Sequence, residues 1–202
     1  MTYSTHIYEP KDFSSLTNSV KGISENAMKN HFKLYEGYVN KTNEINTALI
    51  GCDKSKANHN YSEYRSLLVD KSHNLNGVVL HELFFSNLAT SPIKPDDRLI
   101  NHISNDYPDW DTYIADLKAT CKASRAGWAL SVYNYRDGKI SNFAIDQHNL
   151  LVPAFTVPLV IIDLWEHAYT TDFGIDKPKY IDTIVENINW DIVLRRLENI
   201  ST

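Results

Sequence analysis

Residues 163–169, with the sequence DLWEHAY, carry the clearest chemical signal in the chain. They follow an apolar stretch and place the carboxylate of Asp163 four residues before the imidazole of His167, a spacing at which both groups can bind one ion. Trp165 lies between them and can exclude water. The alternative interpretation is structural, with Asp163 capping the next helix and His167 lying in the interior. The pair is therefore a candidate metal site with a structural role left open.

Two further histidines lie in helical patterns earlier in the chain. His81 occurs in the apolar stretch VVLHELFF, where an imidazole without a partner would be costly, so it either bonds to a carbonyl group or binds an ion. His31 shares one helix face with Tyr35 and Tyr38, which follow it by four and seven residues. Each histidine alone is most simply a packed or surface residue. Together with the pair described above, they would offer three nitrogens and one carboxylate, which suits first-row transition metals, including iron and manganese.

Hydrophobic periodicity indicates which elements must hold these side chains. Ser24 is a candidate helix start, and helical patterns cover residues 27 to about 50 and 61 to about 88. The two segments predict a helical hairpin. Residues 90–92 and 95–97, which contain two prolines, then interrupt the pattern as a linker.

The second half of the chain changes to a period of two, which is typical of strands. After a helix over about residues 109–125, residues 128–135 and 139–145 flank an Arg-Asp-Gly turn and predict a β-hairpin. Residues 159–163 predict a third, buried strand, and short helices would complete the chain. We therefore predict a helical hairpin followed by an α+β part, with a boundary near residues 89–97.

Composition limits the class of protein. The chain has 202 residues, 43% of them hydrophobic, enough for a substantial core without disulfides. Its net charge of −5 argues against a general nucleic-acid or membrane binder, because those surfaces need clustered positive charge. Two cysteines, together with the lack of a secretory signal or a membrane-length apolar run, predict a cytoplasmic protein. The sequence also lacks phosphate-binding loops and the Gly-x-Ser-x-Gly motif of hydrolases.

The order of these motifs resembles the iron/manganese superoxide dismutases over nearly the whole chain. The likeness rests on His31, on His81, on DLWEHAY and on Asn-Ile-Asn-Trp at residues 187–190. It implies that superoxide is converted to dioxygen and hydrogen peroxide while an ion cycles between trivalent and divalent states. One Mn or Fe ion per subunit would be held by four side chains, His31, His81, Asp163 and His167.

The resemblance also implies a fold and an assembly. The fold would be α+β, with an N-terminal α-helical hairpin domain over residues 1–90 and a C-terminal α/β domain over residues 91–202. The C-terminal domain would contain a three-stranded antiparallel sheet, and the two domains would share the ion. A homodimer is implied, with a tetramer as the alternative, and Glu166 would pair with the partner's copy of the ligand His167. Superoxide is then the only small-molecule partner, and no nucleic acid or membrane partner is expected.

The position of one glutamine bears on the choice of metal. Gln147 lies sixteen residues before Asp163, where manganese-type members hold the glutamine that bonds to the metal-bound solvent. Iron-type members place it four residues before the second histidine ligand, and here that position is Gly77. The resemblance therefore favours manganese, with iron as the alternative. His148 is a rival to Gln147 for the same role.

Other expected roles come from the same resemblance. Trp128 and Trp165 correspond to the aromatic residues that keep the site dry, and Tyr38 corresponds to the tyrosine at the substrate entrance. Lys177 corresponds to the basic residue near the entrance, where it would steer the superoxide anion. Glu166 and His148 complete the group of residues expected around the ligands.

The sequence departs from the family pattern at three positions. Tyr38 follows His31 by seven residues instead of eight, which predicts a more regular first helix. Tyr35 and Thr170 replace a histidine and a tyrosine that meet across the family's dimer interface. These changes leave a second hypothesis open, a metal-binding relative with little dismutase activity and a structural or sensing role.

Overall fold

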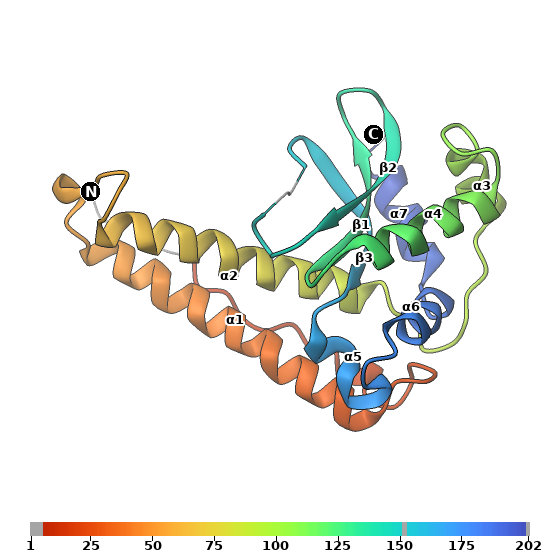
Figure 1. Cartoon of the computed structure of the whole chain (residues 1–202), viewed down its shortest axis with the longest axis horizontal. Coiled ribbons are helices and arrows are strands. Elements are labelled where there is room, and N and C mark those ends of the chain that lie inside the picture. Colours follow the sequence, from red (N-terminus) through yellow and green to blue (C-terminus); the bar gives the residue numbers. More distant parts are fainter. Residues whose placement is uncertain (1–5, 151–152, 201–202) are drawn as a thin grey trace.

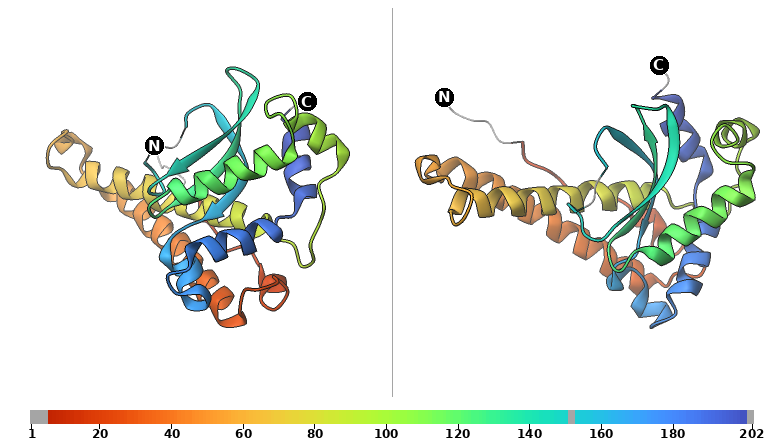
Figure 2. Two further views of the ribbon diagram at one scale, coloured as in Figure 1. Left: turned by 45° about the vertical axis from the view of Figure 1, so that its right-hand side comes forward. Right: turned by 45° about the horizontal axis from the view of Figure 1, so that its top comes forward.

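The N-terminal half of the protein is a long helical hairpin. A computed structural model describes residues 6–150 and 153–200 (Figure 1). In it, α1 (Glu25–Gly51) and α2 (Glu63–Ser86) run antiparallel, and their far end extends away from the rest of the molecule (Figure 2). Two short 3-10 helices, η1 (Ser14–Leu16) and η2 (Lys54–Lys56), lie before α1 and between α1 and α2. The predicted hairpin is confirmed.

Serine side chains begin both long helices. Ser24 Oγ accepts a hydrogen bond from the backbone N–H of Ala27 at 3.1 Å, and Ser62 Oγ accepts one from Arg65 at 3.2 Å. The first helix then continues as regular α-helix through Gly37 to Gly51. This regularity agrees with the prediction drawn from the shortened spacing along this helix.

The C-terminal half combines helices with one sheet. The three strands lie in the order β2-β1-β3, and both pairings are antiparallel. Trp128, the first residue of β1, pairs with Ile145 of β2 on one side and with Asp163 of β3 on the other. The elements are α3 (Asp97–Ile103), α4 (Trp110–Ala123), β1 (Trp128–Asn134), β2 (Lys139–Ile145), β3 (Thr156–Asp163), α5 (Glu166–Phe173), α6 (Lys177–Glu186) and α7 (Trp190–Glu198). The predicted α+β fold with a three-stranded antiparallel sheet is confirmed.

The two halves pack together along the base of the hairpin. Helix α1 contacts α5, and α2 contacts β3. The guanidinium of Arg196 on α7 donates to the carbonyl oxygen of Leu83 at 3.0 Å and to that of Leu159 at 2.6 Å, so it joins α7 to α2 and β3. A β-bridge between Leu88 and Ile188 adds a further link. The division into domains 1–90 and 91–202 stays a prediction, although its boundary falls between α2 and α3.

Within the described part of the chain, the helices fall short of the length and apolar character needed to cross a bilayer.

Candidate metal centre

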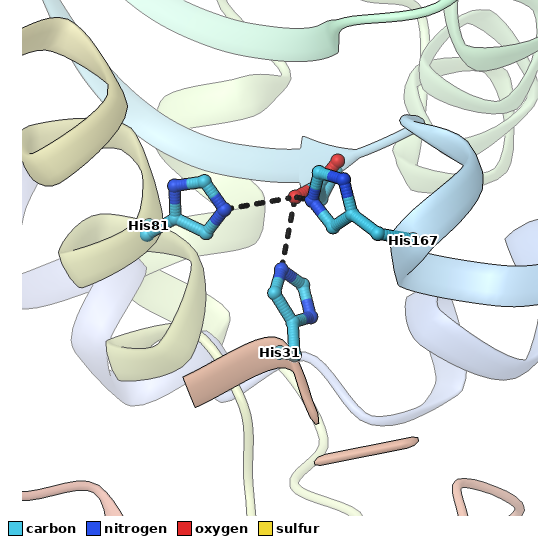
Figure 3. A group of neighbouring side chains, drawn as sticks. His31, His81 and His167 are labelled. Carbon is cyan, nitrogen blue, oxygen red and sulfur yellow. Dashed lines mark hydrogen bonds and ion pairs between the residues drawn. The ribbon is translucent and has the colours of Figure 1, made fainter. Parts of the chain in front are cut away.

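Four side chains from both halves converge on one point. The Nε2 atoms of His31, His81 and His167 lie 3.1, 3.5 and 3.2 Å from Oδ2 of Asp163. The four ligand atoms are all within 4.8 Å of one another. Figure 3 shows the three imidazoles, which come from α1, α2 and α5, pointing toward one carboxylate oxygen. Bonds of about 2.0–2.2 Å to one ion would separate neighbouring ligand atoms by about 3.0–3.6 Å, so these separations suit a single ion.

The imidazole of His81 has one nitrogen reserved for an ion. Its Nδ1 donates to the carbonyl oxygen of Gly77 at 2.6 Å, which leaves Nε2 as the unprotonated nitrogen. That Nε2 is buried and has no hydrogen-bond partner among the described residues. Burial lowers the pKa of His81 to about 3, so the ring is neutral. A buried, unpartnered lone pair beside a carboxylate is the arrangement expected of a metal ligand.

The carboxylate of Asp163 is ionised and held in place by the backbone. Burial alone would raise its pKa, but the charges and hydrogen bonds of His167 and His31 outweigh burial and hold the pKa well below its usual range. Its Oδ1 accepts from the backbone N–H of Trp165 at 2.9 Å, which leaves Oδ2 facing the histidines. Burial also lowers the pKa of His31 and favours its neutral form. The ionised oxygen of Asp163, beside the neutral imidazoles of His31 and His81, can therefore face a cation.

Aromatic rings surround the four ligands. The centroid of Trp128 lies 4.9 Å from that of His81, and the centroid of Phe85 lies 4.9 Å from that of His31. The ring of Trp165 is nearly parallel to that of His167, at 14° and 6.4 Å. Trp128 and Phe85 are fully buried. The exclusion of water by Trp128 and Trp165 stays a prediction.

A fourth histidine and a tyrosine lie beside the ligands without joining them. The centroid of Tyr38 is 5.2 Å from that of His81, and the Tyr38 hydroxyl lies 2.8 Å from Nε2 of His148. On the other side of the His148 ring, Nδ1 accepts the indole N–H of Trp128 at 2.9 Å. Because a neutral imidazole has one N–H, the proton of His148 must lie on Nε2 and be donated to Tyr38. Burial, followed by the charge of His73, lowers the pKa of His148 to about 4 and keeps the ring neutral.

The sequence of the chain is similar to those of known proteins. Residues 95–196 match the family described as iron/manganese superoxide dismutases, C-terminal domain. Proteins named iron superoxide dismutase from Aquifex pyrophilus and from Aquifex aeolicus are each 41% identical over 198 residues, which is 96% of this chain and 92% of theirs. The chain belongs to the iron/manganese superoxide dismutases. A relative named manganese superoxide dismutase 1, from Halobacterium salinarum, is 28% identical over 191 residues, 94% of this chain and 92% of its own.

Membership confirms the predicted family, but the manganese-type placement of the glutamine is not supported in this dismutase. The side chain of Gln147 is exposed, whereas that of its neighbour His148 is buried beside the ligands. The bend after β2 explains the difference, because Asn76 Nδ2 on α2 donates to the carbonyl oxygen of His148 at 2.8 Å and fixes which loop residue faces inward. Spacing along the sequence cannot distinguish two consecutive residues of such a loop.

The position at which iron-type members hold the glutamine, four residues before His81, is Gly77 in this dismutase, and there is a steric reason for glycine at this position. A Cβ atom added at Gly77 would lie 2.8 Å from Cδ1 of Tyr38, closer than packed side chains approach. Glycine on α2 therefore lets the tyrosine ring pack directly against the helix backbone. With Gly77 in this place and Gln147 exposed, His148 is the side chain that occupies the space beside the ligands.

Tyr35 differs from its expected place at a dimer interface. It is buried, donates to Oε1 of Glu82 at 2.9 Å and accepts from the backbone N–H of Lys11 at 3.0 Å. The ammonium of Lys11 also pairs with Glu82 at 2.5 Å. This network ties the segment before α1 to α2 next to the ligand His81. Sequence analysis missed Glu82, although a carboxylate inside the apolar stretch VVLHELFF was the available signal.

Two groups of expected residues lie at the surface or near it. Glu166 and Thr170 on α5 are exposed, and 24% of the His167 side chain remains exposed. Lys177 is half-buried, and its ammonium donates to the carbonyl oxygens of Ser124 at 2.8 Å and Arg125 at 3.2 Å. Burial lowers the pKa of Lys177. The ammonium of Lys177 therefore stabilises the carbonyl groups at the end of α4, and its expected role in steering superoxide stays a prediction.

Proposed function

We propose that this superoxide dismutase works with one iron ion per subunit. Manganese is the alternative, and an experiment must distinguish the two metals. The convergence of three imidazole nitrogens and one ionised carboxylate oxygen on one point carries the proposal of a single ion. When bound, the ion supplies the redox chemistry, oxidising one superoxide to dioxygen in its trivalent state and reducing a second to hydrogen peroxide in its divalent state. Iron is favoured because the two relatives at 41% identity are named for iron.

The ligands would be oriented by the protein backbone. The carbonyl oxygen of Gly77 holds Nδ1 of His81, so Nε2 faces the cluster. The N–H of Trp165 holds Oδ1 of Asp163, so Oδ2 faces it too. Groups held in this way need little rearrangement when the ion changes charge, and their hydrogen bonds tune its reduction potential.

Tyr38 and His148 are suited to supply protons to the product. Reduction of superoxide to hydrogen peroxide consumes two protons, so the site needs a donor that stays protonated. Burial, and then the charge of Asp163, raises the pKa of Tyr38 to about 12, which keeps its hydroxyl protonated near neutral pH. Since His148 donates to the Tyr38 oxygen, the tyrosine's own proton is free to be donated toward the ligand cluster. We therefore assign proton donation to Tyr38, and we assign to His148 the hydrogen bond that orients the Tyr38 hydroxyl.

The dismutase is proposed to act as a homodimer in which Glu166 contacts the partner's copy of His167. The exposed carboxylate of Glu166 has no ion pair within the described residues, and His167 has a partly exposed ring. A ligand imidazole usually donates its second N–H to a carboxylate or carbonyl oxygen, which a second copy would provide. Sedimentation of Glu166→Gln against the native protein tests this pairing, and a tetramer is the other outcome to be distinguished.

We also propose that the protein is located in the cytoplasm, which is a reducing compartment. Both cysteines are free: Cys121 is buried and Cys52 is half-buried. Fractionation of the native cell, followed by antibody detection of the protein, tests this assignment.

Metal analysis of protein purified from its native cell is the deciding experiment. We expect about one iron per chain by elemental analysis and superoxide removal that is lost on chelation and restored by iron. Restoration by manganese alone would overturn the choice of iron while leaving the dismutase reaction intact. A fully loaded protein that removes no superoxide would instead support a structural or sensing relative.

A further inference from the structure

His73 on α2 lies against the Tyr38–His148 pair from the side that faces solvent. Its ring centroid is 4.6 Å from that of His148 and 6.2 Å from that of Tyr38. His73 is half-buried, whereas His148 is fully buried. It precedes Gly77 and His81 by four and eight residues, so all three lie along one face of α2. His73 and the half-buried Tyr38 are therefore the parts of this cluster that water can reach.

Hydrogen bonds on either side of His73 fix this contact. Asn76 Nδ2 donates to the carbonyl oxygen of His148 at 2.8 Å. On the other side, Asn149 Nδ2 donates to Ser72 Oγ at 2.8 Å. Figure 1 shows the segment after β2 descending to α2, where these bonds join the two. The loop is thus bonded to α2 immediately before and just after His73, which holds the two imidazoles together.

We propose that His73 is the residue through which protons from solvent reach the Tyr38–His148 pair. The proposal rests on the dismutase reaction described above, in which superoxide, one electron from the divalent ion and two protons give hydrogen peroxide. His73 acts through the pair and touches neither superoxide nor a ligand, so it is a positioning residue for proton supply.

The direction of transfer follows from the hydrogen bonds of the pair. When Tyr38 gives up its proton, its oxygen keeps the hydrogen bond from the Nε2–H of His148, because a neutral imidazole is a weaker acid than a phenol, so the missing proton must come from outside the pair. The other nitrogen, Nδ1, is already occupied by the indole N–H of Trp128. The ring of His73 also contacts Tyr38, so its proton can return to the Tyr38 oxygen, directly or through one water molecule. His73 then takes a new proton from solvent.

Imidazole is the side chain best suited to this task, because its charge changes near neutral pH. The titratable groups in ring contact with His73 are Tyr38 on α1 and His148 in the loop. Within the described residues, no carboxylate forms an ion pair with His73 that would fix its charge.

Kinetics of two variants test the proposal. We expect His73→Gln to lower kcat about tenfold or more while changing kcat/KM less, because proton supply limits turnover only at high superoxide. Imidazole added to the buffer should restore kcat to His73→Ala and leave the native enzyme unchanged. The control His59→Gln, at an exposed position before α2, should keep native values. A kcat for His73→Gln within about twofold of native, or no response of His73→Ala to imidazole, would overturn the proposal.

A measurement independent of turnover uses the full chain loaded with zinc, which is diamagnetic and redox-inert and accepts nitrogen and carboxylate ligands. The ring N–H signal of His73, assigned by its loss in His73→Gln, should exchange with solvent faster than that of His148 in nuclear magnetic resonance spectra, because the ring of His148 is fully buried. A His73 signal that exchanges no faster than that of His148 would exclude His73 as the carrier of protons from solvent. If the iron-loaded native chain removed no superoxide, the dismutase reaction would fail while this exchange rate still reported on His73 alone.

Discussion

Nε2 of His81 and Oδ2 of Asp163 lie 3.5 Å apart, and both side chains are fully buried. The first atom presents a lone pair and the second presents negative charge, since the proton of His81 lies on Nδ1. Without a cation between them, the two would repel each other in a medium that screens charge poorly. The buried pair therefore couples the stability of the fold to the presence of the ion.

Removal of the ion should lower the melting temperature. An ion present at about a hundred times its dissociation constant stabilises the native state by about 2.7 kcal/mol, which corresponds to roughly 5–10 °C for a chain of this size. Calorimetry before chelation, after chelation and after reloading measures the shift. Equal melting temperatures for the loaded and metal-free chains would contradict this coupling.

His81→Gln should abolish metal binding and superoxide removal while the chain still folds. The amide is close in size but cannot offer the buried nitrogen lone pair that faces Asp163. Elemental analysis gives the metal content per chain, and circular dichroism reports the fold. His102→Gln, in the last turn of α3, serves as the matched control and should keep its metal. Retention of a full ion by the His81 variant would remove His81 from the ligand set.

Gly77→Ala should disturb the site through Tyr38. The added methyl group would lie 2.8 Å from the tyrosine ring, so the ring must move, which costs about 1–3 kcal/mol in unfolding free energy and lowers turnover. Gly37→Ala on α1 is the matched control, because nothing lies within 4 Å of its added methyl group. That control should be stabilised by about 0.5–1 kcal/mol through helix propensity. Denaturant unfolding of both variants shows whether the two effects have opposite signs.

Lys177→Met should destabilise the protein by about 1–2 kcal/mol, because two carbonyl oxygens at the end of α4 lose a charged donor. Lys179→Met, at an exposed position on the same helix, should change the unfolding free energy by less than about 0.5 kcal/mol. If Lys177 also steers superoxide, the salt dependence of kcat/KM will weaken in its variant and remain in the Lys179 variant. An unchanged salt dependence would leave Lys177 with its structural role alone.

The four metal-binding side chains and the fold could be predicted from the sequence, because both depend on strong local patterns. Helical spacing separated α1 from α2, alternation defined the β1–β2 hairpin, and the chemistry of three histidines with one carboxylate narrowed the ion to a few metals. The buried site of Asp163 at the end of β3 likewise followed from an apolar run that ends in a carboxylate.

The residues around the ligands depended on contacts that no local pattern encodes. His148, and not Gln147, faces the ligands. The loop that carries it is held by a hydrogen bond from Asn76, which lies 72 residues earlier in the chain than His148. The inward orientation of Tyr35 depends on Glu82 of α2 and on a backbone group of Lys11. Asn76 and the backbone of Lys11 give no signal in the sequence, and Glu82 gives only a carboxylate inside an apolar stretch, so the packing of α2 against its neighbours is what brings these partners to the site.

The ion would join segments that are far apart in the chain, since His31 and His81 belong to the helical hairpin while Asp163 and His167 belong to the sheet and α5. Because three of the four side chains are buried, an ion cannot leave or enter by side-chain rotation alone. Exchange would require α1 and α2 to separate from β3 and α5, which is a partial unfolding event. The rate of metal exchange should therefore rise with temperature as steeply as an unfolding rate does, so the choice between iron and manganese is made largely when the chain first folds.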